Sequence, residues 1–462
     1  MRRIALLLAA CALLPGCTSL DPPNVRPVAP VPAGWPVGDP YRAEAPALPA
    51  FGHRDVFRDV RLQTLIAQAL QNNRDLRIAA ANIAAARAQV RISRGAQLPQ
   101  VDGAAGLDVT PRRDADGDIN GVRVSPSLSL LPSFELDLFG RLASLTRADQ
   151  ARLLATGAAE RGVRVALIGD IADAWLTYAA DSSLLAIAEN TVRSAERSRS
   201  LTEARLRGGI APRTDLLQAQ QILETARADL AEQRALRAQD LNLLRLLVGA
   251  TVDPSLLPTS LDQAAASVAV LPAGLDSRIL LRRPDIIEAE YRLRAANAEI
   301  GAARAALFPS ISLTGLLGLA SDTLGGLLSG GALAFSASAD VRQSIFSGGA
   351  RRATVRLREA EQQAAVATYE RAIQTAFREV ADALADKGTY DDRVGANQRN
   401  VAAAQQALTL VQARYREGID PFLTTLDAQR SAYAAERNLI AVRLGRASNA
   451  VRLYRVLGGD GV

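Results

Sequence analysis

A bend sequence that occurs twice, 209 residues apart, is the feature that most constrains how this chain can fold. Residues 204–220 and 413–429 are identical at nine of seventeen aligned positions. The shared residues include those that shape a bend between helices, namely Gly209 and Pro212 in the first copy and Gly418 and Pro421 in the second. Glycine suits the left-handed residue that ends a helix, and proline suits the first turn of the next. Because helix-like stretches flank both copies, we expect two long helical hairpins.

A second pair of similar segments extends this repeat toward the N-terminus. Residues 75–99 and 285–309 align at an offset of 210 with eight identities. A nearly constant offset indicates a duplicated half-molecule of about 210 residues. We therefore expect a first repeat at 54–249, a second at 277–459 and an irregular linker at 250–276. Chance similarity is the alternative, but it explains the shared Ala and Arg residues better than the shared Gly-Ile-x-Pro.

The residue types that the chain lacks disfavour enzyme chemistry. Its only histidine is His53 and its only methionine is Met1, which leaves little room for a Ser/His nucleophile or a soft-metal site. His53 follows a Pro-rich stretch and is expected to be a solvated linker residue. The net charge of +6 comes from arginines interleaved with acidic residues, which does not favour nucleic-acid binding. We expect no enzyme activity, no cofactor, no metal site and no nucleic-acid partner.

The N-terminus carries an export pattern. Two arginines precede an apolar run, and residues 1–16 are predicted to be a signal peptide that is too short to span a bilayer as a helix. The run Leu-Pro-Gly-Cys resembles a bacterial lipobox and predicts that Cys17 becomes the lipid-attached first residue. An ordinary signal cleaved elsewhere is the alternative. Residues 17–53, rich in Pro and Ala, are expected to form an extended tether.

Two segments of each repeat change from helical to strand-like periodicity. In residues 122–138 every even position is apolar or proline and nearly every odd position is polar, which predicts a two-faced strand. Residues 101–110 are a plausible hairpin partner. The second repeat has strand patterns at 309–319 and 333–345. No stretch after the predicted signal is apolar for eighteen residues, so we expect no membrane-spanning helix.

The strand pairs can be interpreted in two ways. A strand with one apolar and one polar face is typical of a membrane barrel wall, but also of a hairpin in a soluble α+β domain. Four strands cannot close a barrel alone, and open edges are not tolerated in lipid. A membrane location therefore requires several chains to share one barrel.

Specific motifs then identify a family. The chain resembles the TolC-like outer-membrane efflux proteins, in particular the lipoprotein branch that serves resistance-nodulation-division (RND) pumps. The matching stretches are Phe134–Arg141, Leu281–Ile286, Ile300–Leu313 and residues 413–429. This resemblance implies an α+β membrane protein that forms a homotrimer. Its strands would share a twelve-stranded β-barrel, and its coiled-coil helices would form a tunnel through the periplasm.

The same resemblance implies a function and partners. It predicts a passive outer-membrane exit duct for small toxic compounds or drugs, lipid-anchored on the periplasmic side. The expected partners are a periplasmic adaptor (membrane fusion) protein, an inner-membrane RND-type pump and outer-membrane lipid. Two alternatives stay open, namely a duct for a protein or peptide secretion system and a periplasmic coiled-coil scaffold lipoprotein.

The resemblance also points to a periplasmic gate at the bends. The family's closed tip uses a tyrosine, basic residues and aspartates, and the corresponding positions here are Asp215, Tyr415, Asp420 and Asp427. Three symmetry copies of such aspartates around an axis would crowd like charges and attract arginines. Nearby candidates are Arg213, Arg414 and Arg416. The alternative is that these carboxylates are solvated residues near helix N-termini, stabilised by the helix dipole.

Overall fold

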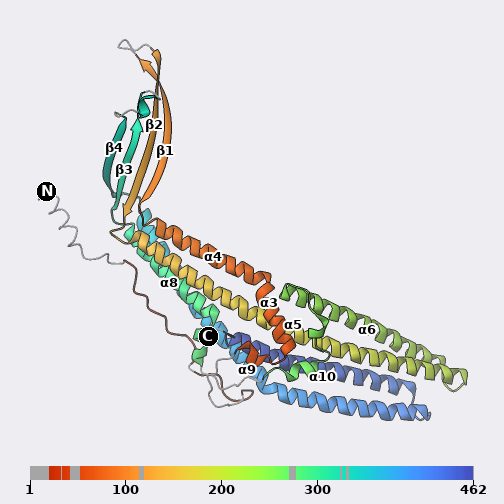
Figure 1. The fold of residues 1–462 in the computed structure, drawn as a ribbon. Coiled ribbons are helices and arrows are strands. Elements are labelled where there is room, and N and C mark those ends of the chain that lie inside the picture. The colour runs from red at the N-terminus through yellow and green to blue at the C-terminus, as the bar shows by residue number, and fades with distance from the viewer. Residues whose placement is uncertain are drawn as a thin grey trace. The chain divides into compact units, whose positions relative to one another are not determined.

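The structure is a computed structural model that describes residues 20–32, 34–41, 52–113, 119–269, 277–322, 325–328 and 332–460. The predicted signal peptide and Cys17 lie outside the described residues. The fold is a mostly helical α+β arrangement with one four-stranded sheet among these residues (Figure 1). The chain divides into two compact units. Unit 1 comprises Met1–Val28, Asn82–Gly157 and Glu288–Glu370, and unit 2 comprises Ala29–Ala81, Ala158–Ile287 and Arg371–Val462.

Long helices account for most of both units. The α-helices are α2 (His53–Val56), α3 (Val60–Asn72), α4 (Arg74–Gly95), α5 (Arg141–Arg207), α6 (Arg213–Val248), α7 (Leu261–Ala266), α8 (Pro284–Ala305), α9 (Ala350–Arg416) and α10 (Phe422–Val456). Short 3-10 turns are η1 (Pro254–Leu256), η2 (Ser277–Arg282) and η3 (Gly325–Leu328). In the part of the chain that the structure describes, no helix has the length and apolarity needed to cross a membrane.

Unit 1 contains the sheet. Its strands are β1 (Gln100–Arg113), β2 (Ile119–Leu136), β3 (Ser310–Ala320) and β4 (Leu333–Arg342), paired antiparallel in the order β1-β2-β3-β4. The two expected hairpins therefore join into one sheet through β2 and β3, with Leu128 opposite Leu319. Strands β2 and β4 end earlier than the predicted ends at 138 and 345, and Ile345 is fully exposed beyond β4.

Two prolines of β2 are not paired with β3, because Pro132 lies in a gap of that pairing and Pro126 lies just beyond its end. Pro126 and Pro132 pair with Leu107 and Val101 of β1, but neither lies in the register between β2 and β3. Proline has no N–H to donate to a neighbouring strand, so it can pair regularly with the strand on only one of its two sides. Opposite Pro132 lies Gly315, where a Cβ atom would come within 3.0 Å of the proline ring. A side chain there would press on the proline ring, so glycine fits this position best.

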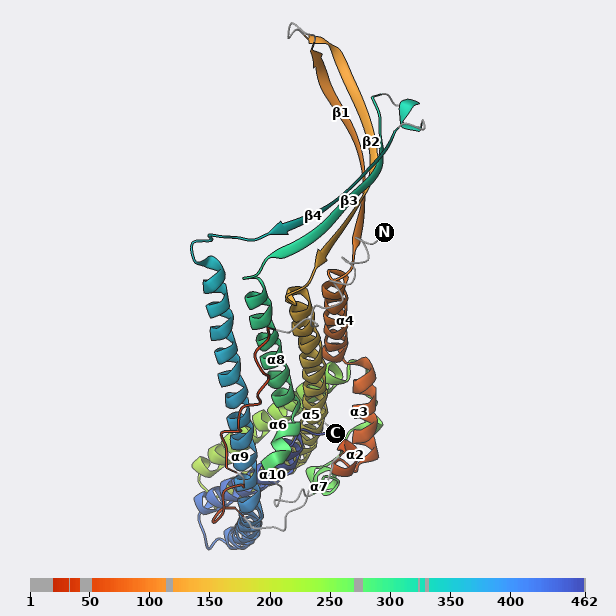
Figure 2. The same cartoon turned by 90° about the vertical axis from the view of Figure 1, so that its left-hand side faces the viewer.

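Beside the sheet, parts of α4, α5, α8 and α9 lie side by side in that order (Figure 2). Polar contacts link each helix to the next. Asp149 of α5 accepts a hydrogen bond from Ser93 of α4 and pairs with Arg152, which also pairs with Glu299 of α8. Glu299 in turn pairs with Arg358 of α9 at 3.0 Å. Strand β1 and helix α4 thus form one side of unit 1, and β4 and α9 form the other.

Unit 2 contains two helical hairpins, α5 with α6 and α9 with α10, together with α2, α3 and α7. Its core is aromatic and aliphatic: Trp175 and Tyr454 are fully buried, and Phe57 contacts Tyr454 edge-on at 5.3 Å between ring centroids. Trp175 Nε1 donates a hydrogen bond to the carbonyl oxygen of Leu256, 3.0 Å away. Helix α7 lies within the stretch 250–276, which the sequence predicted to be irregular.

One expectation for the N-terminal region is wrong. His53 is not a solvated linker residue, because its Nδ1 pairs with the carboxylate of Asp460 near the C-terminus. The described residues between 20 and 41, for which we expected an extended tether, contain no helix and make specific contacts in each unit. In unit 1, Arg26 donates to the hydroxyl of Tyr369 and pairs with Glu290 at 2.8 Å. In unit 2, Trp35 stacks on Phe377.

Candidate functional site

Both predicted bends have the same backbone geometry. Helices α5 and α9 end just before Gly209 and Gly418, whose φ angles of 72° and 75° lie in the left-handed region. In the first bend the N–H of Ile210 donates to the carbonyl oxygen of Arg205 and that of Gly209 to Leu206, each at 3.0 Å. The second bend repeats both bonds, which define a Schellman motif. Pro212 and Pro421 are the N-cap residues of α6 and α10.

An apolar cluster lies between the two bends. Tyr415 is 5% exposed, and its ring centroid is 5.3 Å from that of Phe422. Leu426 of α10 and Ala219 of α6 complete the buried set, and Ile222 packs against it. Because Ala219 and Ile222 belong to the first hairpin and the aromatic residues to the second, this cluster joins the two tips.

Arg205 is the functional candidate that sequence reasoning missed. Its guanidinium carbon lies 4.9 Å from the ring centroid of Tyr415, and its Nη1 donates to the carbonyl oxygens of Tyr415 and Arg416 at 3.0 and 3.1 Å. The Oγ1 of Thr202 lies 3.4 Å from the Tyr415 hydroxyl. A signal was available, because Arg205 occupies the same place in its repeat as Arg414, which the sequence nominated.

The predicted aspartates have three different environments. Arg414 binds Asp420 through two hydrogen bonds of 2.8 and 2.9 Å, and this contact holds the pKa of Asp420 below its usual range. Burial raises the pKa of Asp215, and the nearby charge of Arg205 opposes that effect. Asp427 is exposed, and no hydrogen bond or ion pair reaches its side chain from the described residues.

The arrangement at the bends therefore differs in part from the expected network. It brings Tyr415 and Arg205 together and pairs Asp420 with Arg414 inside one bend. Arg213 has no ion-pair partner among the residues described. Arg416 contributes only its backbone carbonyl oxygen, which accepts a hydrogen bond from Arg205. Within the described ranges, no three His, Cys, Asp or Glu side chains converge on a common point. The site can act as a joint between two hairpins, held by one cation–π contact and an apolar cluster.

The described residues thus form one four-stranded sheet with two open edges and two long helical hairpins that are joined at their bends. The family model described as outer membrane efflux protein matches residues 65–250 and 275–459. The chain belongs to this family of outer-membrane efflux proteins.

Curated relatives are similar over almost the whole chain. The solvent efflux pump outer membrane protein SrpC of Pseudomonas putida is 40% identical over 99% of this chain and 98% of its own length. The outer membrane protein OprJ of Pseudomonas aeruginosa is 40% identical over 99% of this chain and 94% of its own. The chain is therefore an efflux protein of the outer membrane, as the motifs predicted.

Solved structures agree with the fold. A structure of CusC, described as addressing conformational changes in folding and transmembrane channel formation, aligns with a TM-score of 0.84 and 37% identity, over 96% of this chain and 100% of the other. The open state of the Neisseria gonorrhoeae MtrE outer membrane channel aligns with a TM-score of 0.83 and 34% identity, over 96% and 98%. The family and these neighbours are channel proteins and not enzymes.

Proposed function

We propose that three copies of this chain form a passive exit duct for small toxic organic compounds. The observation that carries the proposal is the sheet of unit 1. All fourteen residues of β1 are exposed, and β1 and β4 each leave one edge unpaired within the described chain. A sheet with two open edges and little buried surface is not stable alone and invites pairing with other copies. Pairing β1 of one copy with β4 of the next would close the strands into a twelve-stranded barrel.

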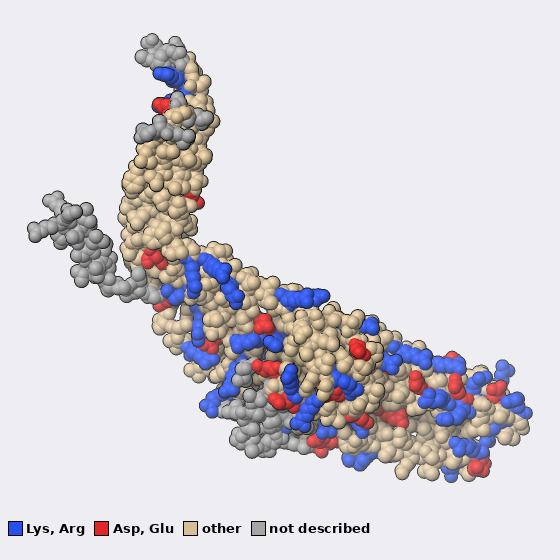
Figure 3. Space-filling model, in the orientation of Figure 1, with Lys and Arg blue, Asp and Glu red and all other residues tan. Residues whose placement is uncertain are grey.

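The surface of the sheet supports a location in lipid. Figure 3 shows few charged residues over the strands, whereas arginines and acidic residues are dense over the helices. Large apolar side chains are exposed along the strands, for example Leu128 and Phe335 at 52% and 75%. In water such an apolar surface promotes aggregation, whereas the hydrocarbon layer of a membrane requires apolar side chains on the outer face of a barrel.

The flanking helices support a closed ring. Helix α4 buries only Ala79 and Val90, so most of its alanine-rich surface faces outward, and α9 likewise exposes Leu357 on the opposite side of unit 1. Two different surfaces that meet head to tail generate a ring when the rotation closes. The family resemblance favours three copies, so that the helices continue the barrel as a tunnel.

We also propose that Cys17 carries a lipid anchor. Four residues after Cys17, the carboxylate of Asp21 accepts hydrogen bonds from Ser144 and Arg147, both at 2.8 Å. Ser144 lies in the first turn of α5, shortly after the end of β2. A chain of four residues spans at most about 14 Å. An acyl chain on Cys17 would therefore start near the junction of sheet and helices. In the proposed barrel, the periplasmic face of the outer membrane would lie at this junction.

Partners and cargo follow from the bends and from the relatives. The bends expose Ile210 and Ile419 at 67% and 61%, which supports docking of a periplasmic adaptor that links the duct to an inner-membrane RND-type pump. Relatives are named for toluene, solvent and antibiotic efflux, which supports a cargo of small organic molecules.

The matched segments 65–250 and 275–459 support the proposed repeats at 54–249 and 277–459.

We place the closed end of the duct at the bends. Asp215, Asp420 and Asp427, together with Tyr415, would form its periplasmic gate, and Arg205 would hold the two tips together. Around a threefold axis the carboxylates of Asp215 and Asp427 would favour cations and oppose one another, whereas each Asp420 is balanced by Arg414, so removing the three aspartates together changes both the repulsion and the pairing.

Single-channel conductance in a planar bilayer tests the duct and its gate. The acylated, detergent-purified protein should give small, cation-favouring currents that rise when Asp215, Asp420 and Asp427 are changed together to Ala. The matched control is Glu232→Ala, which removes an exposed carboxylate of α6 away from the bends and should leave the current unchanged. Absence of insertion by a verified acylated oligomer would favour the scaffold alternative. A triple variant that conducts no better than wild type would refute the gate.

A further inference from the structure

Unit 1 carries a band of arginines on its helices next to the sheet, where Figure 3 shows basic side chains beside the strands. Arg87, Arg91 and Arg94 follow one another at intervals of four and three residues, so they share one face of α4. Helix α4 ends one residue after Arg94, which places the three arginines about 12, 6 and 2 Å from the helix end. On the other side of unit 1, Arg352 and Arg356 lie in the first two turns of α9. These five residues are the arginine band.

The arginine band has no acidic partner in the described chain. Its members are exposed, and no hydrogen bond or ion pair reaches their side chains from any described residue. The carboxylates in and beside the same turns are already paired with other arginines: Glu135 with Arg141 at 2.7 Å, Asp149 with Arg152 at 2.7 Å, Glu359 with Arg304 at 2.9 Å, and Glu299 and Glu361 with Arg358 at 3.0 and 2.7 Å. Asp137 accepts the backbone N–H of Ala143 at 2.7 Å. The charge left over beside the sheet is therefore positive.

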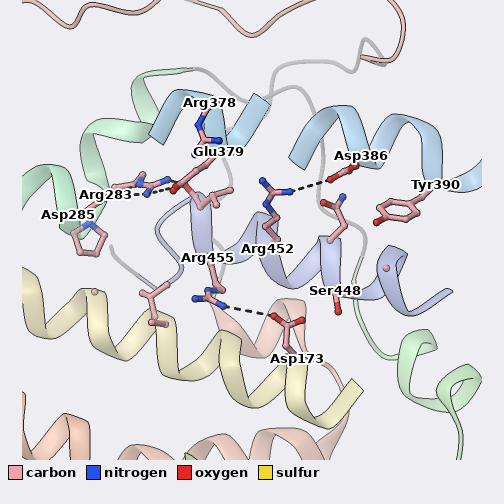
Figure 4. A pocket seen from close by; sticks show the side chains of 17 residues that line it. Asp173, Arg283, Asp285, Arg378, Glu379, Asp386, Tyr390, Ser448, Arg452 and Arg455 are labelled. Atoms are coloured by element: carbon pink, nitrogen blue, oxygen red, sulfur yellow. Dashed lines mark hydrogen bonds and ion pairs between the residues drawn. The ribbon is translucent and has the colours of Figure 1, made fainter. Parts of the chain in front are cut away.

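The charged cavity of unit 2 is different. It has a volume of about 720 Å³, and four arginines and four carboxylates line it (Figure 4). Two of these arginines, Arg283 and Arg452, bind Glu379 and Asp386 at 2.8 and 3.2 Å. The cavity is neutralised by its own side chains, whereas the arginine band requires an anion from outside the described chain.

Exposed apolar side chains lie between the arginine band and the strands. Leu98, four residues after Arg94, is 63% exposed, and Phe346, six residues before Arg352, is 90% exposed. An apolar side chain toward the sheet and an arginine toward the helix match the order of layers at a membrane surface, where acyl chains give way to phosphate groups. Both ends of unit 1 therefore have the composition of a membrane interface.

The internal repeat shows that an anionic group occupies the equivalent place elsewhere in unit 1. At the offset of 210, Arg91 of α4 corresponds to Gly301 of α8. The carboxylate of Asp21 lies so close to Gly301 that a methyl group there would overlap it. At the offset of 209, Arg356 of α9 corresponds to Arg147 of α5, whose Nε donates to the same carboxylate at 2.8 Å. The surfaces of α4 and α9 carry arginines at these positions and have no such carboxylate among the described residues.

We propose that the arginine band binds the phosphate groups of anionic phospholipids in the membrane leaflet that faces the periplasm. This inference rests on the proposed membrane location of the sheet and adds the class of lipid that surrounds it. Guanidinium groups bind phosphate oxygens through paired N–H donors. The headgroup layer on each side of a bilayer is about 5–8 Å thick, which matches the depth of Arg91 and Arg94 below the sheet. Free phosphate would use the arginines alone, whereas a phospholipid also covers Leu98 and Phe346.

Lipid selection by the full-length, detergent-purified protein tests the proposal. The protein is inserted into nanodiscs of equal parts phosphatidylglycerol and phosphatidylcholine and released with mild detergent. Native mass spectrometry then counts the lipids that stay bound. We expect about fivefold enrichment of phosphatidylglycerol in wild type, because one arginine near an anionic surface strengthens binding by about this factor.

A matched pair of variants locates the binding surface. Arg91→Gln, Arg94→Gln, Arg352→Gln and Arg356→Gln combined should return the bound lipids to nearly equal proportions. The control removes the same charge from unit 2, at arginines that also have no ion pair among the described residues: Arg197→Gln, Arg234→Gln, Arg237→Gln and Arg399→Gln. This control should retain the enrichment of wild type.

Salt provides a test on the wild type that does not depend on variants. Raising NaCl from about 0.05 M to about 0.5 M shortens the screening length about threefold and should remove most of the enrichment. Equal retention of both lipids by inserted wild type, or enrichment that the four substitutions in the arginine band leave unchanged, overturns this inference and leaves the duct unaffected. Enrichment that excess inorganic phosphate abolishes at constant ionic strength would show a site for the free anion and overturn the lipid assignment. Failure to enter discs of any composition would overturn the membrane location as well.

Discussion

Asp181 of α5 and Asp240 of α6 form a carboxyl pair across the first helical hairpin, and we predict that this pair makes the hairpin sensitive to pH. The two carboxyl groups interact with each other, and Oδ2 of Asp240 has no hydrogen-bond partner among the described residues. Burial, together with the charge of Asp181, raises the pKa of Asp240 to about 7. Burial also raises the pKa of Asp181. No described arginine acts on either carboxyl group.

The sign of the effect follows from proton linkage. The folded pair keeps a proton up to about pH 7, whereas an unfolded Asp loses it near pH 3.8. The stabilisation is therefore fully present below the unfolded value and is lost as pH rises through about 7. The interval between these two values corresponds to about 4 kcal/mol. Because both side chains are half-buried, solvent screening reduces this to about 1–2 kcal/mol.

The perturbation is Asp240→Asn, which keeps a hydrogen-bonding side chain but removes the titration. Hydrogen exchange of backbone amides in the middle of α5 and α6 measures local opening. Between about pH 5.5 and 8, which covers roughly half of the interval in which the stabilisation is lost, corrected protection in wild type should fall by about 2- to 5-fold, as expected for about 0.5–1 kcal/mol. The variant should show little change. Glu232→Gln, an exposed substitution on α6, should behave like wild type. The reasoning is refuted if Asp240→Asn retains the wild-type pH dependence.

Two further substitutions test the tips and the N-terminal segment. Arg205→Ala removes a cation–π contact and two hydrogen bonds and should loosen the joint by about 2 kcal/mol, seen as faster exchange at residues 413–420 and larger channel currents. An unchanged exchange rate there would count against the joint. Gly301→Ala should displace residues 20–28, because its methyl group would overlap the Asp21 carboxylate, and raise their exchange about tenfold. Gly157→Ala, which meets open space, is the matched control.

The helical hairpins could be predicted because their signals are local. A glycine and a proline three residues apart determine where each helix ends and the next begins, and the structure has both bends at those residues. The strands were predictable for the same reason, since a period of two residues is visible within one segment. Their ends were less so, because the last paired residue depends on where the neighbouring strand ends and not on its own sequence.

Contacts between distant parts of the sequence could not be predicted. His53 and Asp460 are 407 residues apart, and the sequence around neither residue indicates that they form a pair. The docking of residues 20–28 depends equally on partners in α5, α8 and α9. A Pro-rich composition correctly indicates extended backbone, but it does not say whether that backbone contacts a surface.

The missed role of Arg205 can be explained by a difference between the two bend sequences. At an offset of 209, Arg205 corresponds to Arg414, and Ala211 corresponds to Asp420. Arg414 has a carboxylate six residues ahead and binds it within its own bend. Arg205 has only the methyl group of Ala211 at that place, so its guanidinium group stays available and instead reaches Tyr415 in the other hairpin. The difference of one acidic residue between the two bends thus accompanies a contact within one bend and a contact between the bends.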